Sequence, residues 1–414
     1  MKIGMISHWY DPEGGAAAGP GTIARALRDR GHDVHVVTGY PIYPAGKVFD
    51  GYRIRPYQRE CMDGVTVHRF PAYPSHDDRA AHRMANYLSF ATTGSIGALA
   101  VLRDVDVVFV YSTPATVGAA GVLLRLVERK PYLVQIQDLW PDTVTSSGFV
   151  NDADRVGTME KALHRACNTV YRFASRVAVT SPGMADLLVE RGVPRGKIDF
   201  VPNWAEERSF HPAPVDAGLR DELGLPSGGF VAMYAGNLGE QQSLETVIEA
   251  AALLRDRSDI TFALVGAGVA EGRLRRLVQD KGLTNVVFSG AQPFSRMAQV
   301  LALGDVQLVT LKDVPLYRAT LPSKLQANLA CGRPTIAAVA GDGGALIEAA
   351  GGIAVAPESP DELADAVRAM ASSSADERSA LGRRARDYYL ANYSEQVIGD
   401  RLSELLLSVA EGAR

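Results

Sequence analysis

A lysine at the start of a predicted helix is the side chain of this sequence with the clearest chemical use. Pro322 and Ser323 precede Lys324, and Gly332 follows the segment, a pattern typical of a helix entered through proline and ended by glycine. The first N–H groups of a helix lack intrahelical partners and carry the positive end of the helix dipole, so a cation there is unfavourable unless an anion is bound. The turn therefore indicates a phosphate site. A solvated lysine on a surface helix is the alternative that the motif alone leaves open.

A carboxylate and a pair of glycines follow two predicted buried strands. Asp138 comes shortly after the apolar run 132–136. Gly14 and Gly15 lie in the Gly- and Ala-rich loop after the run 2–7, which has neither the Walker lysine spacing nor a GxGxxG fingerprint. Open α/β sheets bind ligands at the carboxyl ends of their strands, and glycines let backbone N–H groups approach a ligand closely. Capping of the next turn by Asp138, and an ordinary turn at the glycines, are the structural alternatives.

Strands and helices alternate in two successive series, which predicts two tandem parallel α/β domains. The first series has expected strands at 2–7, 32–38, 105–111, 132–136, 176–180 and 197–201, and helices at 22–30, 115–127 and 155–174. After a linker at 202–212, strands are expected at 230–235, 260–265, 286–289, 306–311, 335–339 and 353–355, and helices at 244–254, 271–281 and 297–303. Further helices are expected at 360–372 and 376–391, and a last amphipathic helix to Ala410 follows Tyr393-Ser-Glu-Gln. Two such domains predict a ligand site where the two sets of strand ends meet.

Length, charge and cysteine content narrow the class of protein. At 414 residues the chain exceeds what one hydrophobic core usually supports, which favours two domains. The net charge of −4 gives no indication of nucleic-acid binding. Cys61, Cys167 and Cys331 follow no metal-binding pattern and are expected to be free, buried thiols in a reducing cytoplasm. The first residues are expected to form a strand and do not resemble a signal peptide.

Two stretches of the first half depart from the regular alternation. The segment between Arg83 and Arg103 has no charge and is long enough to span a bilayer, but its Ser, Thr, Gly and Asn residues favour a buried helix. Residues 40–80 mix aromatic side chains with arginines around a short hairpin-like piece at 64–70; the arginines are Arg53, Arg55, Arg59, Arg69 and Arg79. This region is either a partner-specific surface or a solvated loop, and peripheral membrane contact near it stays open.

A series of short motifs, in order along nearly the whole chain, resembles those of retaining glycosyltransferases of family 4, which have the GT-B fold. The motifs are Pro12-Glu-Gly-Gly15, Arg30-Gly-His-Asp-Val-His-Val-Val-Thr38, Pro41-Ile-Tyr-Pro44, Asp138-Leu-Trp-Pro141, Val201-Pro-Asn-Trp204, Tyr234-Ala-Gly-Asn-Leu-Gly239, Val265-Gly-Ala-Gly268 and Pro322-Ser-Lys324. The similarity looks closest to the subgroup that builds bacterial polysaccharides with N-acetylated amino-sugar donors. Each motif is weak by itself, whereas the ordered set is specific for the superfamily.

The resemblance implies a donor pocket in the second domain. Lys324 would neutralise the leaving diphosphate of a nucleotide sugar. The other residues implied are Asn237, Gly239 and Gln242 on the phosphate side, Gly266, Gly290 and Gln292 beside the nucleoside, and Pro322, Ser323 and Leu325 in the turn around the lysine.

The first domain would supply the rest of the site. By the same resemblance, Gly14 and Gly15 would close over the donor, and Asp138 would face the reacting sugar or the acceptor hydroxyl. Such enzymes are thought to retain the anomeric configuration by front-face departure and attack, without a covalent nucleophile, a metal or another cofactor. Charge develops on the leaving diphosphate in such a reaction, so cations and fixed N–H dipoles supply most of the stabilisation.

The chain departs from the family pattern at the ribose. The family usually has a glutamate in the helix after its Pro-Ser-Lys turn and often a second acid one loop earlier, where this chain has Ala327 and Ala319. A carboxylate there accepts hydrogen bonds from ribose hydroxyls, each worth about 1.5–3 kcal/mol. Either Gln326 or another group replaces it, or the donor differs, or the protein does not turn over a normal donor.

The sequence therefore predicts a GT-B protein whose two Rossmann-like domains face each other across a cleft. The acceptor domain is expected at 1–203, completed by a C-terminal helix at 395–414, and the donor domain at 204–394. The expected activity is retaining, metal-independent transfer from a nucleotide sugar, UDP before GDP, to a sugar, a polyprenyl-linked acceptor or a natural-product metabolite. Expected locations are the cytoplasm and, peripherally, the inner membrane face, with no nucleic-acid partner. A non-catalytic GT-B binding subunit, suggested by Ala327, and a sugar-nucleotide epimerase are the rival hypotheses.

Overall fold

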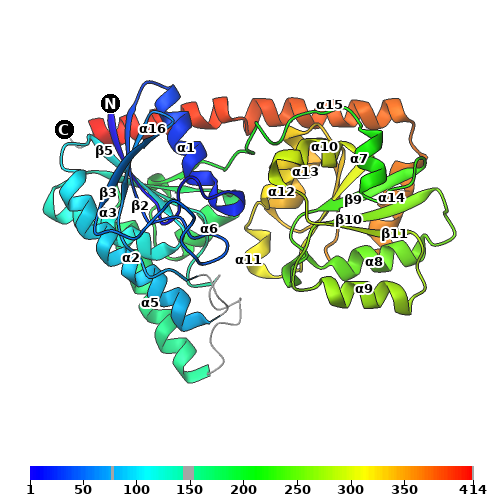
Figure 1. The fold of residues 1–414 in the computed structure, drawn as a ribbon, viewed down its shortest axis with the longest axis horizontal. Helices are drawn as coiled ribbons and strands as arrows, with labels where there is room; N and C mark the ends of the chain where they lie inside the picture. The colour runs from blue at the N-terminus through cyan, green and yellow to red at the C-terminus, as the bar shows by residue number, and fades with distance from the viewer. Residues whose placement is uncertain (76–78, 143–152, 413–414) are drawn as a thin grey trace. The chain divides into compact units, whose positions relative to one another are not determined.

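The computed structural model describes residues 1–75, 79–142 and 153–412, and the chain divides into two compact units (Figure 1). Unit 1 is Met1–Pro202 together with Ile398–Arg414, and unit 2 is Asn203–Val397. Each unit is built around a sheet of mainly parallel strands with helices on both faces (Figure 1). The predicted fold class, two α/β units with parallel sheets, is confirmed.

The sheet of unit 1 has the strand order β3-β4-β2-β1-β5-β6-β7-β8, and its neighbours are parallel except for β3 and β4. The described strands are β1 Lys2–Ile6, β2 Asp33–Thr38, β3 Gln58–Met62, β4 Val65–Arg69, β5 Val107–Ser112, β6 Tyr132–Ile136, β7 Arg176–Val179 and β8 Ile198–Phe200. The described helices are α1 Gly19–Asp29, α2 Ala80–Val101, α3 Gly118–Val127, α5 Ala153–Phe173, α6 Pro182–Glu190 and α16 Glu395–Glu411, of which the last enters the unit from the end of unit 2.

The sheet of unit 2 is parallel throughout, in the order β11-β10-β9-β12-β13-β14. Its strands are β9 Phe230–Ala235, β10 Ile260–Val265, β11 Val286–Gly290, β12 Val306–Thr310, β13 Thr335–Ala338 and β14 Ile353–Val355. Its helices are α7 Ala217–Glu222, α8 Leu244–Leu253, α9 Glu271–Asp280, α10 Met297–Ala302, α11 Pro315–Arg318, α12 Ser323–Ala330, α13 Asp342–Ala349, α14 Pro360–Ser372 and α15 Ala375–Asn392.

The central strand of unit 2 shows why continuous apolar runs fold into this layered sheet. Successive side chains of a strand point to opposite faces. On β9, Phe230, Ala232 and Tyr234 pack into the core that contains α8, whereas Val231 and Met233 pack into the core that contains Val300 of α10. In Figure 1, α8 and α10 lie on opposite sides of this sheet. A strand covered on both faces must be apolar at every position, and this is how β9 reads.

Most expected elements are present, and the differences lie in short elements and element ends. Helix α1 begins at Gly19 rather than at 22, because Pro20 falls within its first turn, where proline is tolerated. Strand β3 and the helices α7, α11 and α13 were not expected. The three helices are four to eight residues long, too short to show a helical period in the sequence.

Two side-chain expectations for the first half are wrong. Cys61 is exposed, because it lies on the edge strand β3, whose alternate side chains face outward; Cys167 and Cys331 are buried as expected. Arg69 is fully buried and cannot belong to a ligand surface. Its guanidinium pairs with Glu60 and donates to the carbonyl of Gly39 at 2.8 Å, so it holds strands β3 and β4 to the loop after β2.

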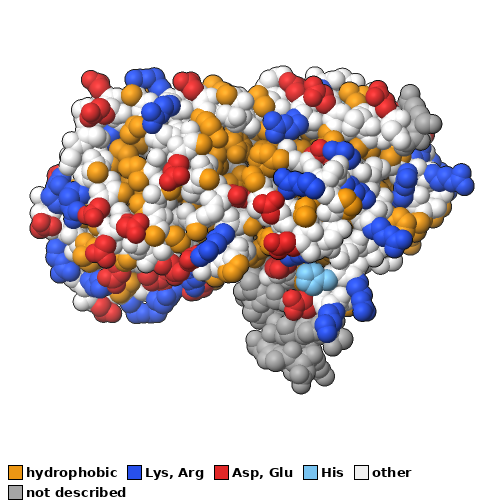
Figure 2. All heavy atoms as spheres, turned by 180° about the vertical axis from the view of Figure 1, so that it is seen from behind, with side chains coloured by type: hydrophobic (Ala, Val, Ile, Leu, Met, Phe, Trp, Pro, Cys, Tyr) orange, Lys and Arg blue, Asp and Glu red, His pale blue; other side chains and the backbone are white. Residues whose placement is uncertain are grey.

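The uncharged segment forms α2, and only part of its surface is buried. Leu88 and Ile96 are exposed, which corrects the expectation of a buried helix. Within the residues described, no helix combines the length and apolar character needed to cross a bilayer. The face shown in Figure 2 carries basic and acidic side chains interspersed, in keeping with the nearly balanced charge of the chain.

Candidate active site

Lys324 is the second residue of α12, and its side chain is buried against the end of β9. The Nζ atom donates a hydrogen bond to Oε1 of Gln242 at 2.7 Å and lies 5.0 Å from the ring centroid of Tyr234. No carboxylate faces it among the described residues, and burial lowers the pKa of Lys324 to about 8. The solvated-lysine alternative is therefore wrong. A desolvated ammonium without a counter-charge indicates that an anion binds here.

The backbone around the lysine offers further hydrogen-bond donors. Among the described residues, no acceptor pairs with the N–H groups of Ser323 and Lys324 at the start of α12. The Leu325 N–H, in contrast, already donates to the carbonyl of Pro322 at 2.9 Å. The turn implied by the resemblance thus presents two available N–H groups beside the ammonium, at the positive end of the helix dipole.

A series of hydrogen bonds holds the side chain of Gln242 beside Lys324. The Tyr234 hydroxyl lies 2.7 Å from the carbonyl oxygen of Asn237 and 3.0 Å from Oε1 of Gln242. Thr310 on the neighbouring strand β12 donates to the Gln242 carbonyl. Gln242 is therefore held at two atoms: Tyr234 of β9 contacts the amide oxygen that accepts from Lys324, and Thr310 of β12 fixes the backbone carbonyl.

The loop after β9 is shaped by the lysine that crosses it. Gly236 has φ +147°, and a Cβ added there would lie 2.3 Å from Cε of Lys324. Gly239 is buried and a Cβ there would meet the amide of Asn237, whereas the Asn237 side chain itself is exposed. Glycine at 236 thus suits both the positive φ and the close approach of the lysine side chain. Sequence reasoning named Asn237, Gly239 and Gln242 but missed Tyr234 and Gly236, although both stand in the same motif.

The two glycines assigned beside the nucleoside differ in what explains them. Gly266 follows β10 and has φ +146°, and a Cβ there would clash with the Gly236 carbonyl oxygen, so packing of the two loops suffices to explain it. Gly290 ends β11 with φ +68°, and a Cβ there would meet open space. Its carbonyl accepts from the Gly266 N–H at 2.8 Å, and Gln292 Nε2 donates to Ser289. The ends of β9, β10 and β11 therefore lie in one row.

The residues expected at the ribose do not supply a carboxylate. Ala319 and Ala327 are buried, and Gln326 beside the latter is 3% exposed. Within the described part of the chain, Oε1 of Gln326 has no hydrogen-bond partner. If Gln326 takes the role of the family's ribose-binding glutamate, its side-chain amide must contact the ribose from a buried position.

In unit 1, the glycine loop is held by a buried carboxylate beside it. Glu13 accepts hydrogen bonds from the backbone N–H groups of Tyr10, Ile42 and Tyr43 at 2.7–3.0 Å, which joins the loop after β1 to the loop after β2. Gly14 and Gly15 remain exposed, and a Cβ on either would meet open space. The matched motifs around 12–15 and 41–44 therefore form one structure, which presents the two glycines to solvent.

Asp138 lies at the same edge of the sheet, two residues past the end of β6. Its Oδ2 accepts a hydrogen bond from Thr113 Oγ1 at 3.2 Å, and burial raises the pKa of its carboxyl. It caps no described helix. A largely desolvated carboxylate at the carboxyl end of a parallel strand fits a group that accepts a hydroxyl proton better than a turn cap.

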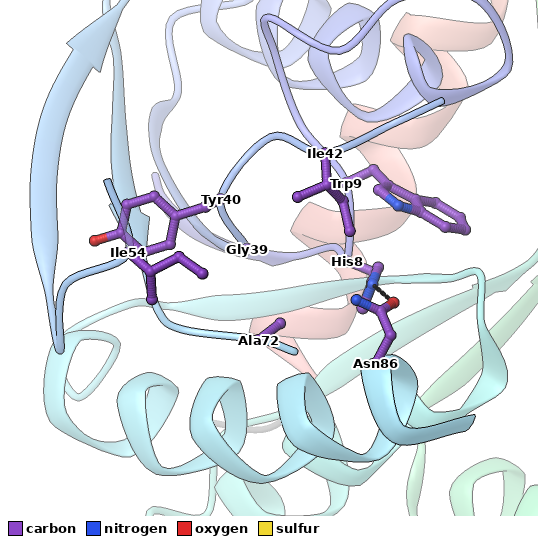
Figure 3. A pocket seen from close by; sticks show the side chains of 8 residues that line it. All are labelled: His8, Trp9, Gly39, Tyr40, Ile42, Ile54, Ala72 and Asn86. Atoms are coloured by element: carbon purple, nitrogen blue, oxygen red, sulfur yellow. Dashed lines mark hydrogen bonds between the residues drawn. The ribbon is translucent and has the colours of Figure 1, made fainter. Parts of the chain in front are cut away.

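An aromatic cluster around His8, which sequence reasoning missed, adjoins this edge of the sheet. His8 follows β1, and its Nε2 lies 2.7 Å from Oδ1 of Asn86 on α2. Its ring makes edge contacts with Trp9 and Tyr87, and Tyr87 in turn contacts Trp140. Figure 3 shows the small pocket that His8 and Asn86 line together with Trp9, Gly39, Tyr40, Ile42, Ile54 and Ala72.

Two protein-family models match the chain, the glycosyl transferase 4-like domain over residues 14–204 and the glycosyl transferases group 1 domain over residues 229–373. The chain is 32% identical over 378 residues to the putative colanic acid biosynthesis glycosyl transferase WcaI of Escherichia coli (strain K12), an alignment that covers 89% of this chain and 91% of WcaI. The chain belongs to glycosyltransferase family 4. It is therefore a glycosyltransferase, as the ordered motifs predicted.

Solved structures confirm the GT-B fold of this transferase. Sucrose-phosphate synthase from Thermosynechococcus elongatus superposes with a TM-score of 0.74 at 20% identity and covers 99% of each chain. HepE of Anabaena in complex with UDP-glucose superposes with a TM-score of 0.71 at 19% identity and covers 99% of this chain and 100% of HepE. At these identities the likeness concerns the fold, and the roles of individual residues stay predictions.

Replacing Asp138 by Asn is expected to lower kcat of the transferase about 100-fold or more, the usual range for loss of a general base. The amide keeps the shape and an acceptor for Thr113 but cannot take a proton. Wild-type kcat should decrease as the pH is lowered and Asp138 becomes protonated. Because burial raises the carboxyl pKa, the midpoint of this decrease should lie above the pKa range of an ordinary aspartate. The variant should lack this acid limb. Steady-state kinetics over a pH series checks both, and a variant with wild-type kcat would exclude a catalytic role.

Proposed function

We propose that this transferase moves a sugar from a UDP-sugar to an acceptor hydroxyl, with retention of the anomeric configuration and without a metal ion. The observation that carries the proposal is the buried ammonium of Lys324, which has no acidic partner among the described residues and lies beside two available N–H groups of α12. Together these groups supply the positive charge that a diphosphate leaving group needs.

In the proposed reaction, the charge that most needs stabilisation develops on the leaving group. As the bond between the anomeric carbon and the diphosphate oxygen breaks, negative charge grows on the diphosphate. A preorganised cation and N–H dipoles in a desolvated position stabilise that charge more than they stabilise the ground state. A divalent metal would have the same task, and Lys324 with the α12 terminus performs it in this proposal.

The donor base and the acceptor rest on the comparisons. HepE, which shares the fold, was solved with UDP and with UDP-glucose, which supports UDP as the nucleotide. WcaI is named for colanic acid biosynthesis, which supports a polysaccharide or glycolipid acceptor, with a natural-product acceptor as the remaining option. The amino-sugar subgroup that the motifs resemble makes an N-acetylhexosamine a candidate for the transferred sugar.

Unit 1 is proposed to hold the acceptor. Asp138 would take the proton of the acceptor hydroxyl, and the aromatic side chains around His8 offer faces on which a sugar ring can stack. The exposed arginines Arg53, Arg55 and Arg59 lie near the exposed Tyr57 in sequence, a mixture that suits the phosphates and interface of a membrane with a polyprenyl-linked acceptor. Location at the inner membrane face is part of this proposal.

The deciding experiment is a thermal-shift panel of nucleoside diphosphates and nucleotide sugars in the presence of EDTA. A ligand at about a hundred times its Kd adds roughly 2.7 kcal/mol of stability. Uridine nucleotides are expected to stabilise the protein and guanosine nucleotides to do so weakly. A guanosine preference would overturn the choice of donor, and no shift with any nucleotide would count against a donor site that lacks the ribose carboxylate.

A further inference from the structure

A pocket of unit 2 lies away from the residues assigned to the donor. It is formed by the loop between α12 and β13, the residue before β12 and one face of α15, and its volume is about 370 Å³. That size is within the range of small-molecule sites. Its charged lining residues are Arg333, Arg378, Arg383, Arg386, Asp305 and Asp387, and we refer to it as the arginine pocket. Four arginines and two aspartates give its lining a net charge of +2.

The arginine pocket and the donor residues lie at opposite ends of the unit 2 strands. Asp305 precedes the first residue of β12, and Arg333 comes two residues before β13, so both stand at the amino ends of parallel strands. Lys324 and Asn237 follow the carboxyl ends. Helix α12 connects the two places, because Lys324 is in its first turn and Cys331, which lines the pocket, is its last cap. The pocket is therefore a separate site.

Part of the arginine lining has a structural task. Arg386 donates to the carbonyl of Ala330 at the end of α12, Arg333 donates to the carbonyl of Gly304, and Arg378 to that of Ser373. These bonds use only a fraction of the N–H groups that the guanidinium forks carry. These bonds to backbone carbonyls therefore leave most guanidinium N–H groups of the pocket available, within the described part of the chain.

The remaining arginine groups lack partners. Within the described part of the chain, Arg383 makes no hydrogen bond or ion pair, and Nε of Arg333 is buried without an acceptor. Burial also lowers the pKa of the Arg333 guanidinium, the mark of a cation that has lost water without gaining enough negative charge.

Among the described residues, Asp305 offsets part of this charge: it favours the charged form of Arg333, although the effect of burial is larger. Asp305 lies 3.5 Å from Arg378 and also accepts from the N–H of Val231 at 2.9 Å. Asp387 makes no ion pair with any described residue. On α15, Arg378, Gly382 and Arg386 are spaced four residues apart, which places them on one helix face. That face presents cations to a hollow that has too few acids to balance them.

We propose that the arginine pocket binds a phosphate group, either as inorganic phosphate or as the ester of a small phosphorylated molecule. A phosphate monoester carries a charge of about −1.5 to −2 near pH 7, which matches the net charge of the lining. Planar guanidinium forks suit its oxygens, with two parallel hydrogen bonds from one arginine. The pocket has room beyond a phosphate ion for an organic part.

Isothermal titration calorimetry with inorganic phosphate and with glucose 6-phosphate tests the proposal. The titrations use the full-length Lys324→Ala variant at constant ionic strength set with sodium chloride, so that binding beside α12 is removed and screening is matched. Saturable binding is expected. Arg383→Gln should weaken it about tenfold, the loss of one charge-assisted contact, because Arg383 has no structural bond to lose.

The matched control is Arg384→Gln, one residue further along α15. Arg384 is also exposed and basic, but it faces Gly351 and does not line the pocket, so its variant should bind as the parent does. Arg333→Lys, which keeps the charge and removes the fork, should also weaken binding. Tighter binding of glucose 6-phosphate than of phosphate would identify an ester as the ligand, and equal binding would identify inorganic phosphate. Absence of saturable binding, or equal losses in the 383 and 384 variants, would overturn the proposal.

Discussion

The Lys324→Ala variant of this transferase is expected to lose at least about 10²–10³-fold in kcat while it remains folded. Removal of one neutral hydrogen-bond donor to a developing oxyanion typically costs that much, and Lys324 is charged and desolvated, which makes its contribution at least as large. The measurement is the initial rate of nucleoside diphosphate release from the nucleotide sugar that the thermal-shift panel selects.

The melting temperature of the Lys324→Ala variant distinguishes a loss of catalysis from misfolding. Within the part of the chain that the structure describes, Lys324 is buried without an acidic partner, so its ammonium costs free energy of folding and its removal should leave the melting temperature unchanged or raised. The control is Lys281→Ala, which removes a lysine from a surface ion pair with Glu249. Surface pairs contribute about 0–1 kcal/mol, so this variant should keep both rate and stability. A Lys324→Ala enzyme with unchanged kcat would contradict the assigned diphosphate site.

The fold of the transferase could be predicted from sequence because its strands are covered on both faces. Strands β6, β9 and β10 have the expected bounds, since each is a largely apolar run between polar or glycine-containing turns; the short edge strand β14 also has its expected bounds. The edge strand β3 shows the opposite case. It reads Gln-Arg-Glu-Cys-Met with alternate side chains exposed, so neither its apolar content nor its length predicts a strand.

Individual residues of the candidate site could be predicted only where they belong to a local sequence motif. Lys324 was assigned from its position in a helical turn, but its contact with Gln242 joins residues 82 positions apart, and no local pattern contains that distance. Glu13 was quoted as part of a motif, and its three backbone partners show that it holds two loops together. His8 carried no signal, because a single histidine after a strand is most often part of the core.

The second large effect expected from Lys324 is a dependence of UDP affinity on pH. Burial lowers the folded-state pKa of this lysine from 10.5 to about 8. A folded pKa below the unfolded value means that the folded protein binds fewer protons between these two pH values, so stability of the free protein should rise as pH increases from 8 towards 10.5. A bound diphosphate favours the charged form and reverses that preference.

UDP should therefore bind with constant affinity between about pH 7 and pH 8 and about tenfold more weakly for each pH unit above it, until the pKa of the complex is reached. At pH 8 the complex should take up about half a proton, because half of the free protein has a neutral Lys324 there. The terminal phosphate of UDP, with a pKa of about 6, is fully ionised over this range and adds no proton change of its own.

Calorimetry in two buffers of different ionisation enthalpy measures this uptake directly. The Lys324→Ala variant provides the control, since it should bind UDP weakly and take up no proton around pH 8. Affinity that is flat up to pH 10 in the wild type would mean that the ammonium is not the group that meets the diphosphate. The combination of a proton taken up by the wild type and none by the variant would tie the nucleotide to Lys324 without reference to turnover, and so independently of the acceptor.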